Sequence, residues 1–252
     1  MNNGPTTARE FMLSFLSQYP RQNDRTLIFF PPALSFHAVA ASLGERHDIL
    51  LGVQNVHWED QGAFTGELSV PIARDAGARL VLVGHSERRH VFGETDEDCA
   101  RKCAAVERGG LTPMLCVGET LEQRDAGQAE ATITRQLRAG LSRMTQLQQR
   151  PFAIAYEPVW AIGTGKTATP DDATTMHEVI RDELDSLCGD RARTTSILYG
   201  GSVNPGNAPQ LIAAPEVDGL LVGGASLDPG VWLAIARATI KGALRNDGTT
   251  KA

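Results

Sequence analysis

The chain has 252 residues, of which 42% are hydrophobic, so it is long enough to bury a sizeable core. Its formal net charge of −6 argues against a general nucleic-acid-binding protein. No apolar run approaches the roughly 18 residues that span a bilayer, and no basic segment followed by an apolar core marks a signal peptide, so we expect a cytoplasmic protein that does not bind membranes.

The first predicted element is a helix within residues 1–20. Thr7 and Glu10 have the spacing of a capping box, in which each side chain satisfies a backbone N–H at the helix start. Apolar side chains in residues 11–16 supply one face, and Pro20 marks the end. The chain therefore begins with a helix, whereas in the rest of the sequence each helix follows a strand.

Seven short apolar runs that favour strands follow along the chain. They cover 26–30, 49–56, 79–85, 112–119, 152–160, 196–202 and 219–224. Most are continuous rather than alternating, which is typical of strands buried on both faces of a parallel sheet. Helical patterns separate them at 34–47, 96–107, 121–147 and 170–187, and shorter ones follow 204 and 228. No linker divides the chain, so we expect a single α/β domain over residues 1–252.

Two architectures fit alternating strands and helices: an open, doubly wound sheet or a closed (β/α) barrel. A dinucleotide-binding open sheet would have G-x-G-x-x-G after its first strand, and that signature is absent. A barrel places its chemistry at the carboxyl ends of its strands. Unusual polar residues stand at those ends here, namely Asn55, His85, Glu119, Glu157 and Ser202. The barrel is therefore favoured, although it needs eight strands and only seven are recognisable.

The segment GHSERR, residues 84–89, places a histidine where a strand ends and a helix begins. At that position His85 lies near the positive end of the helix dipole, which disfavours the imidazolium form. A neutral imidazole can donate a hydrogen bond to a substrate oxygen. A purely structural role is the commoner one for an isolated histidine at such a place, and both interpretations stay open on this segment alone.

The segment AYEPVWAIGTGKTATP, residues 155–170, places a carboxylate at the end of a strongly apolar strand. Glu157 loses hydration there, so its pKa should rise and it becomes a better base near neutral pH. Two stiff stretches, 158–160 and 166–168, flank a small Gly-rich tip, which is the design of a lid on two hinges. An ordinary surface loop is the alternative, but Trp160 and Ile162 imply that the segment packs onto something when it closes.

The last two strands both run into a glycine pair and then a short helix, in LYGGSVNP (198–205) and LLVGGASL (220–227). Glycine lets a backbone approach a ligand, and free N–H groups at a helix start favour an anion. Barrel phosphate sites use these last two loops. A base, a neutral histidine, a lid and a phosphate grip together indicate proton abstraction next to a carbonyl in a small phosphorylated substrate.

At this point the sequence resembles the triosephosphate isomerase family, from Met1 to about Arg237. The motifs that carry the resemblance are QNVHWEDQGAFTGE (54–67), VGHSERR (83–89), CVGETLEQR (116–124), YEPVWAIGTGK (156–166), YGGSV (199–203) and GLLVGGASL (219–227). The resemblance implies a TIM (β/α)8-type barrel. It also implies an intramolecular aldose–ketose isomerase of glycolysis and gluconeogenesis, which interconverts dihydroxyacetone phosphate and D-glyceraldehyde 3-phosphate through an enediolate, without metal or cofactor.

The resemblance implies roles for particular residues. Glu157 would be the base that shuttles the proton, and His85 the electrophile that polarises the carbonyl. Phosphate would be held by Gly163, Ser202, Gly223 and Gly224. Supporting residues would be Glu87, Arg88, Ile162 and Leu221, the last two clamping over the base and desolvating it.

The resemblance also implies a homodimer. Residues 57–67 are similar to the family's dimer loop, whose Thr65 would dock beside the active site of a partner subunit. Trp58 and Phe64 on this loop are apolar residues that a monomer would leave partly exposed.

One departure from the family lies at the start of the sequence. The family has an Asn-x-Lys segment at the end of its first strand, immediately before a Met-Asn similar to Met1-Asn2. The sequence given starts at that methionine, so we expect the first strand and the lysine to be missing from these residues. Either Met1 is an internal methionine of a longer protein or the protein starts here, and the sequence does not choose.

The departure carries three expectations. Loss of one preorganised donor typically costs about 10²- to 10³-fold in rate, so turnover should be impaired. Dimerisation should be weakened, because the partner's loop would dock next to the missing segment. Another segment could fill the slot, water could enter it, or the oligomer could rearrange. The alternative function is a disabled barrel that binds phosphorylated trioses without efficient turnover; another sugar-phosphate enzyme is disfavoured by the YEPVWAIGTGK segment.

Overall fold

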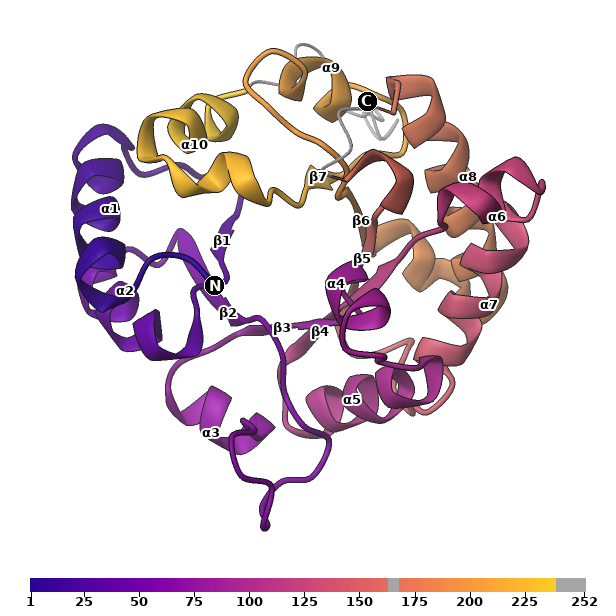
Figure 1. Ribbon diagram of the computed structural model, residues 1–252, viewed down its shortest axis with the longest axis horizontal. Helices are drawn as coiled ribbons and strands as arrows, with labels where there is room; N and C mark the ends of the chain where they lie inside the picture. The colour runs from indigo at the N-terminus through magenta and orange to yellow at the C-terminus, as the bar shows by residue number, and fades with distance from the viewer. Residues whose placement is uncertain (163–167, 239–252) are drawn as a thin grey trace, which may run out of the picture.

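The computed structural model of the chain describes residues 1–162 and 168–238. These residues form one parallel sheet in the order β1 to β7, surrounded by helices (Figure 1). The strands are β1 (Leu27–Phe29), β2 (Ile49–Val53), β3 (Leu80–Val83), β4 (Thr112–Val117), β5 (Ala153–Tyr156), β6 (Ser196–Tyr199) and β7 (Gly219–Leu220). Each lies within one of the seven apolar runs, so the predicted strand positions are confirmed.

The helices alternate with these strands. The α-helices are α1 (Pro5–Gln18), α2 (Phe36–Leu43), α3 (Val70–Asp75), α4 (Ser86–His90), α5 (Asp96–Arg108), α6 (Leu121–Asp125), α7 (Ala129–Leu141), α8 (Pro170–Cys188), α9 (Ala208–Ile212) and α10 (Pro229–Ala236). Short 3-10 helices are η1 (Ala33–Ser35), η2 (Val159–Ala161), η3 (Gly189–Thr194) and η4 (Gly224–Leu227). None of the helices in these ranges is long and apolar enough to cross a membrane.

The capping box predicted for the first helix is wrong. Helix α1 starts at Pro5, whose missing N–H is not needed in the first turn, and no side chain caps Gly4. Thr7 Oγ1 instead donates to the carbonyl oxygen of Gly4 at 3.0 Å. The apolar face was predicted correctly at Met12 and Phe15, which are fully buried, but wrongly at Leu13, which is 60% exposed.

The single helix predicted over 121–147 is also wrong. A capping box between Thr120 and Gln123 starts α6, which ends after five residues. Gly127 then adopts a φ of 68°, a left-handed conformation that interrupts a helix, and α7 begins two residues later. The helices predicted at 96–107 and 170–187 are confirmed within one residue at each end as α5 and α8.

The strands differ in burial according to their place in the sheet. Every residue of β3 and β5 is buried, and β4 is buried from Pro113 to Val117. By contrast, both residues of β7 are only half-buried, as are two of the three residues of β1. The prediction of burial on both faces therefore holds for β3, β4 and β5. It fails for the edge strands β1 and β7, which have a neighbour on one side only, and for β6, where Ser196 is exposed and Leu198 is half-buried.

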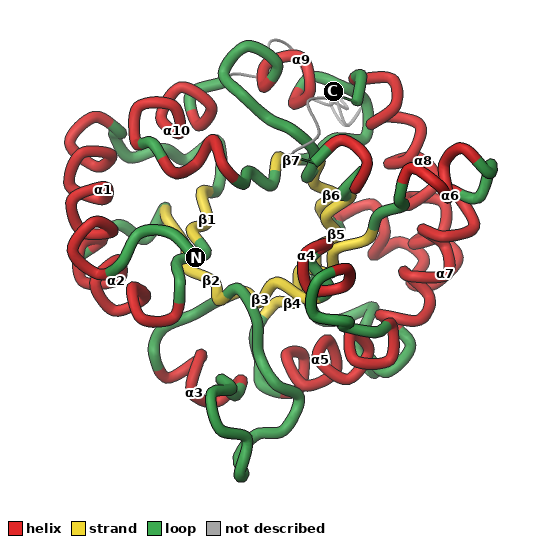
Figure 2. The backbone as a smooth tube through the Cα atoms, viewed as in Figure 1, coloured by secondary structure: helices red, strands yellow, loops and turns green. Residues whose placement is uncertain are grey.

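The sheet curls into an incomplete barrel with an open seam between β1 and β7 (Figure 2). Strand β1 pairs with β2 and strand β7 pairs with β6, and no described segment pairs with their outer edges. Outside the seam α10 lies beside α1. Arg25 Nη1 donates to the carbonyl oxygen of Ala236 at 2.8 Å, and Trp232 packs edge-on against Phe29 with ring centroids 6.0 Å apart.

Candidate active site

His85 and Glu157 meet at the carboxyl ends of the strands. His85 precedes α4, and its Nδ1 accepts the backbone N–H of Glu87 at 3.3 Å. With Nδ1 acting as an acceptor, the proton of the neutral ring is on Nε2, and Nε2 lies 3.0 Å from Glu157 Oε1. Glu157 directly follows β5 and is 2% exposed. The structure thus brings together the two residues that sequence reasoning had singled out separately.

Ser86 completes the contacts of the Glu157 carboxylate and was missed by sequence reasoning. Its backbone N–H donates to Oε2 at 2.9 Å, and its hydroxyl donates to Oε1 at 3.4 Å. A backbone N–H at the start of α4 is one of the groups that a short helix leaves unpaired. The only sequence signal was its position beside His85, because 71 residues separate it from Glu157 along the chain.

The direction expected for the pKa shift of His85 needs correction. Burial lowers its pKa, but the hydrogen bond and the charge of Glu157 raise it more, so the pKa lies above its usual 6.5. The prediction from the helix dipole had the opposite direction. The reason is that a carboxylate 3.0 Å away outweighs the dipole of a helix of five residues.

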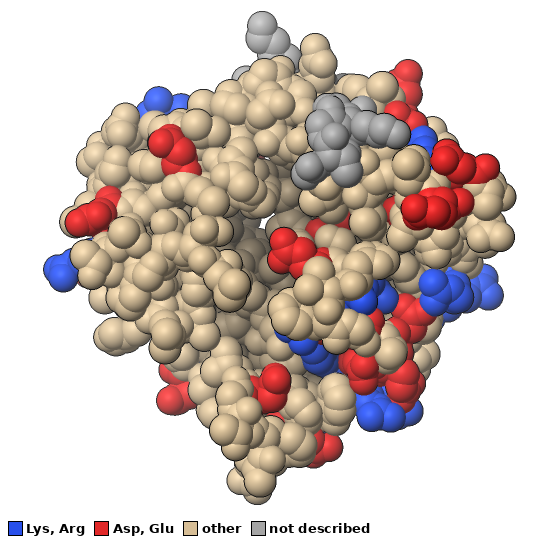
Figure 3. Space-filling view, viewed as in Figure 1, with Lys and Arg blue, Asp and Glu red and all other residues tan. Residues whose placement is uncertain are grey.

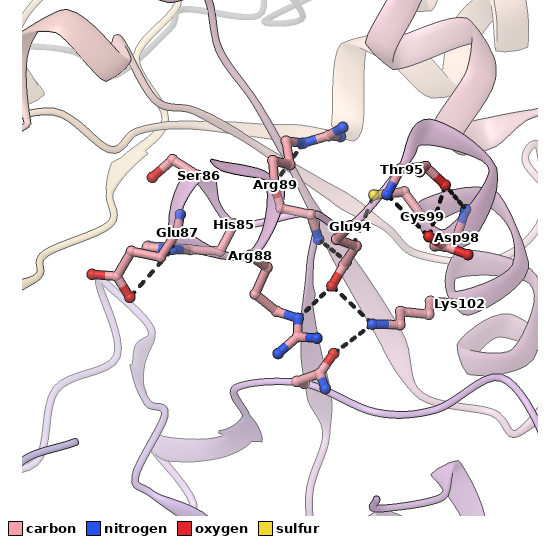
Figure 4. Close-up of polar contacts among 12 residues, drawn as sticks. His85, Ser86, Glu87, Arg88, Arg89, Glu94, Thr95, Asp98, Cys99 and Lys102 are labelled. Atoms are coloured by element: carbon pink, nitrogen blue, oxygen red, sulfur yellow. Dashed lines mark hydrogen bonds and ion pairs between the residues drawn. The ribbon is translucent and has the colours of Figure 1, made fainter. Parts of the chain in front are cut away.

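A buried charge cluster around Glu94 lies near His85 (Figure 4). Glu94 accepts the backbone N–H of Gly84 at 2.9 Å, the ammonium of Lys102 at 2.9 Å and the guanidinium of Arg88. Lys102 also donates to Asn55 Oδ1 at 2.7 Å. Burial raises the pKa of Glu94, but Lys102 and Arg88 hold it below its usual value. The cluster ties the ends of β2 and β3 to α5, and no sequence spacing predicted it.

The two predicted supporting residues of α4 differ in their surroundings. The Glu87 side chain is 76% exposed, and its carboxylate is 4.0 Å from His85 Nδ1. Arg88 contacts Glu94, and its guanidinium lies 5.3 Å from the ring centroid of Phe92. Glu87 is therefore free to pair with a cation from outside the described contacts, whereas Arg88 is already engaged.

Glu119, at the end of β4, anchors the segment that follows Glu157. Its Oε1 accepts Tyr156 OH at 3.0 Å, Trp160 Nε1 at 2.8 Å and Arg124 Nη1 at 3.2 Å. The carboxylate is fully buried. The first hinge expected of the lid is thus fixed by a side chain from the neighbouring strand. Residues 163–167 of the lid, which include Gly163, lie outside the described residues, and of the second hinge only Ala168 is described.

The predicted phosphate residues line the same cavity as the pair. The cavity has a volume of about 2150 Å³ and opens at the centre of the face in Figure 3. Its lining includes His85, Glu157, Ile162, Ser202, Leu221, Gly223 and Gly224. Ser202 and both glycines of the second pair are exposed, and a Cβ on either glycine would meet nothing within 4 Å. The backbone around them is open to a ligand.

Gly200 and Gly201, the first glycine pair, are required for a different reason. A Cβ on Gly200 would lie 2.9 Å from Glu157 Cγ, and one on Gly201 would lie 2.1 Å from Tyr199 OH. Both distances are too short for any side chain. These glycines therefore make room for the protein's own side chains, and the approach of their backbone to a ligand stays a prediction.

The expected dimer loop projects from the ring between β2 and α3 (Figure 1). On it the ring of His57 stacks between those of Trp58 and Phe64, at centroid distances of 4.3 and 4.2 Å. Phe64 remains 43% exposed, and Thr65 is exposed as well. The loop thus presents an aromatic stack to solvent.

Comparison with known proteins yields one family. A family model described as triosephosphate isomerase matches residues 1–239. The triosephosphate isomerase of Roseiflexus sp. strain RS-1 is 50% identical over 229 residues, covering 90% of each chain. That of Lactobacillus delbrueckii subsp. bulgaricus is 42% identical over 236 residues, covering 93% of each.

A solved structure agrees. The crystal structure of triosephosphate isomerase from Bartonella henselae matches with a TM-score of 0.84 at 35% identity, covering 94% of this chain and 95% of that one. This likeness confirms the predicted barrel fold.

Proposed function

The chain belongs to the triosephosphate isomerase family, a family of enzymes, and from that premise we propose that Glu157 and His85 interconvert dihydroxyacetone phosphate and D-glyceraldehyde 3-phosphate. The observation that carries the proposal is the 3.0 Å contact between His85 Nε2 and Glu157 Oε1 inside the cavity that Gly223 and Gly224 also line. It combines a base, a hydrogen-bond donor and open backbone in one place.

The chemistry follows from the groups present. Glu157 takes a proton from the carbon next to the carbonyl and returns it to the neighbouring carbon. His85 Nε2–H donates to the substrate oxygen on which negative charge develops. Both oxygens of Glu157 are occupied by Ser86 and His85 in this structure, so the carboxylate exchanges these contacts for the substrate when it acts.

The phosphate of the substrate is bound at the opposite side of the cavity. Ser202 offers a hydroxyl, and the exposed backbone of Gly223 and Gly224 offers N–H groups. Gly163 joins them from the lid, and Ile162 and Leu221 close over Glu157. The exclusion of water by this closure holds the enediolate until the proton returns.

We extend the proposal to assembly and location. The loop bearing Trp58, Phe64 and Thr65 mediates a homodimer, and the enzyme works in the cytoplasm.

A coupled isomerase assay on Glu157→Gln tests the function. The amide cannot accept the proton, so turnover should fall at least 10³-fold below that of the parent. Glu130→Gln, a change at an exposed position of α7, is the control and should leave turnover unchanged. Activity of Glu157→Gln within tenfold of the parent would refute the assignment.

The alternative is a barrel that binds phosphorylated trioses without efficient turnover. Titration with a hydroxamate mimic of the enediolate, beside the assay, separates the two functions. Binding without turnover supports the disabled barrel, whereas binding with turnover that Glu157→Gln removes supports the isomerase.

A further inference from the structure

Strand β4 extends beyond the end of its neighbour β3. Beyond that end, side chains instead of strand β3 form hydrogen bonds with the backbone of β4. The last paired residues of the two strands are Val83 and Leu115. Beyond them, the carbonyl oxygen of Cys116 accepts Arg89 Nη2 at 3.1 Å. The next backbone groups on that side of β4 belong to Gly118, and unpaired groups in a buried place are costly.

Gln136 of α7 satisfies both backbone groups of Gly118. Its Oε1 accepts the N–H of Gly118 at 2.8 Å, and its Nε2 donates to the carbonyl oxygen of Gly118 at 3.1 Å. Gln136 is 5% exposed, so water does not compete easily for these bonds. A primary amide has one donor face and one acceptor face, as a peptide group of an adjacent strand has. Gln136 therefore supplies Gly118 with the two hydrogen bonds that a neighbouring strand would supply.

Gly118 in turn is in direct contact with the backbone of Glu157. A Cβ on Gly118 would lie 1.8 Å from the carbonyl oxygen of Glu157, so the two backbones are as close as a glycine allows. On either side, Val117 O accepts the N–H of Glu157 at 2.8 Å and Glu119 O accepts that of Val159 at 3.1 Å. A displacement of Gly118 therefore passes to Glu157 and to the contact with His85.

We infer that Gln136 is a positioning residue that fixes the carboxylate of Glu157 relative to His85 through the backbone of Gly118. The inference rests on the proposed function only for its effect on turnover. The series of contacts from Gln136 through Gly118 to Glu157 is given by distances between described residues.

Gln136→Met tests the inference, because methionine has a similar volume and can make neither hydrogen bond. We expect kcat to fall about 10- to 100-fold, as misplaced catalytic groups do, with KM changed less than about twofold. Gln128→Met, at an exposed position just before α7, is the matched control and should behave as the parent. Unchanged kcat in a folded Gln136→Met protein would overturn the role in turnover.

A readout without substrate keeps the test valid if the isomerase assignment fails. Glu157, Glu87 and Glu94 all raise the pKa of His85, and only Glu157 is in the path from Gln136. NMR titration of His85 should show a lower pKa in Gln136→Met than in the parent and in Gln128→Met. If the pKa is the same in all three, the positioning role is refuted; if it falls but no protein turns over substrate, the role stands and the proposed function fails.

A second variant guards against a fold defect. Gln136→Glu keeps the acceptor for the Gly118 N–H and regains a donor only when it is protonated. Its loss of kcat relative to the parent at the same pH should therefore shrink as the pH is lowered from 8 to 6. A constant deficit, with melting curves that match the parent, would contradict the role of the two hydrogen bonds.

Discussion

The middle of the sheet and its two edges are made of similar apolar runs but end in different environments. In the middle, β3, β4 and β5 have a strand on each side and their core residues are fully buried. At the edges, β1 and β7 pair on one side only and are largely half-buried. The comparison shows that β1 and β7, which lack a second neighbour, are less buried than β3, β4 and β5, although all of them lie in apolar runs.

The two regions also divide the proposed site. His85 and Glu157 follow middle strands. The side chains of Glu94 and Gln136 accept backbone N–H groups near them, and Glu119 accepts the hydroxyl of Tyr156. The proposed phosphate residues, by contrast, follow β6 and β7, next to the seam. The proposed chemistry thus lies on the side of the barrel whose strands are paired on both edges, and the proposed phosphate site lies toward the side whose outer edge is unpaired.

Adding a strand at the seam between β1 and β7 should change the free energy of unfolding more than any other change proposed here. A version with an apolar β-strand fused before Met1 would give β1 and β7 a second neighbour. Each backbone group that is paired instead of left unpaired contributes about 1–3 kcal/mol, so several pairs should raise the free energy of unfolding by about 5 kcal/mol. Urea denaturation followed by circular dichroism measures it.

The control for this fusion is the same segment with proline at alternate positions, which cannot donate to the ladder. Equal unfolding free energies for the parent and the apolar fusion would show that the seam costs nothing. A gain that the proline version shares would show that added length, rather than strand pairing, is responsible.

Matched truncations come next in size. Ile154 lies in β5 with no exposed surface, and Ile28 lies half-buried in β1. Ile154→Ala should lower the free energy of unfolding by about 4 kcal/mol, because the cavity cannot collapse between two paired strands. Ile28→Ala should cost about 1–2 kcal/mol, since the side chain is only half-buried. Similar losses in urea denaturation would erase the distinction between the two regions.

The burial of the middle strands should also make the free energy of unfolding depend on pH. His177 of α8 packs edge-on against Tyr156 and donates from Nδ1 to the carbonyl oxygen of Glu216 at 2.9 Å. Burial lowers its pKa to about 4. Between about pH 6.5 and 4 the unfolded chain binds a proton at this histidine that the folded chain does not bind. The free energy of unfolding therefore decreases as the pH is lowered through this range, by up to about 1.4 kcal/mol per pH unit from this group.

His177→Asn can keep a donor near Nδ1 and does not titrate. Its unfolding free energy, measured by urea denaturation at half-unit steps from pH 7 to 4, should fall less steeply than that of the parent. His37, an exposed residue, gives the control His37→Asn, which should keep the parent's slope. Identical slopes for the parent and His177→Asn would mean that His177 is not neutral in the folded protein.

The sequence by itself determined the order of strands and helices, the glycines of the last two loops and the residues at the strand ends. Continuous apolar runs bounded by turn residues report local backbone preference, and that is enough to place a strand within a few residues. The sequence also pointed to His85 and Glu157, because a histidine and a carboxylate directly after predicted buried strands are unusual even without a structure.

Only the tertiary structure decided what these residues touch. The contact of Ser86 with Glu157 spans 71 residues of chain, that of Lys102 with Asn55 spans 47, and the bonds of Gln136 to Gly118 link a helix to a strand end. Neither spacing nor residue type encodes such pairs, because they form when separate strand ends arrive at the same rim. For the same reason the raised pKa of His85 could not be predicted: local sequence reports a helix dipole, whereas the position of a carboxylate 3.0 Å away depends on how the whole sheet curls.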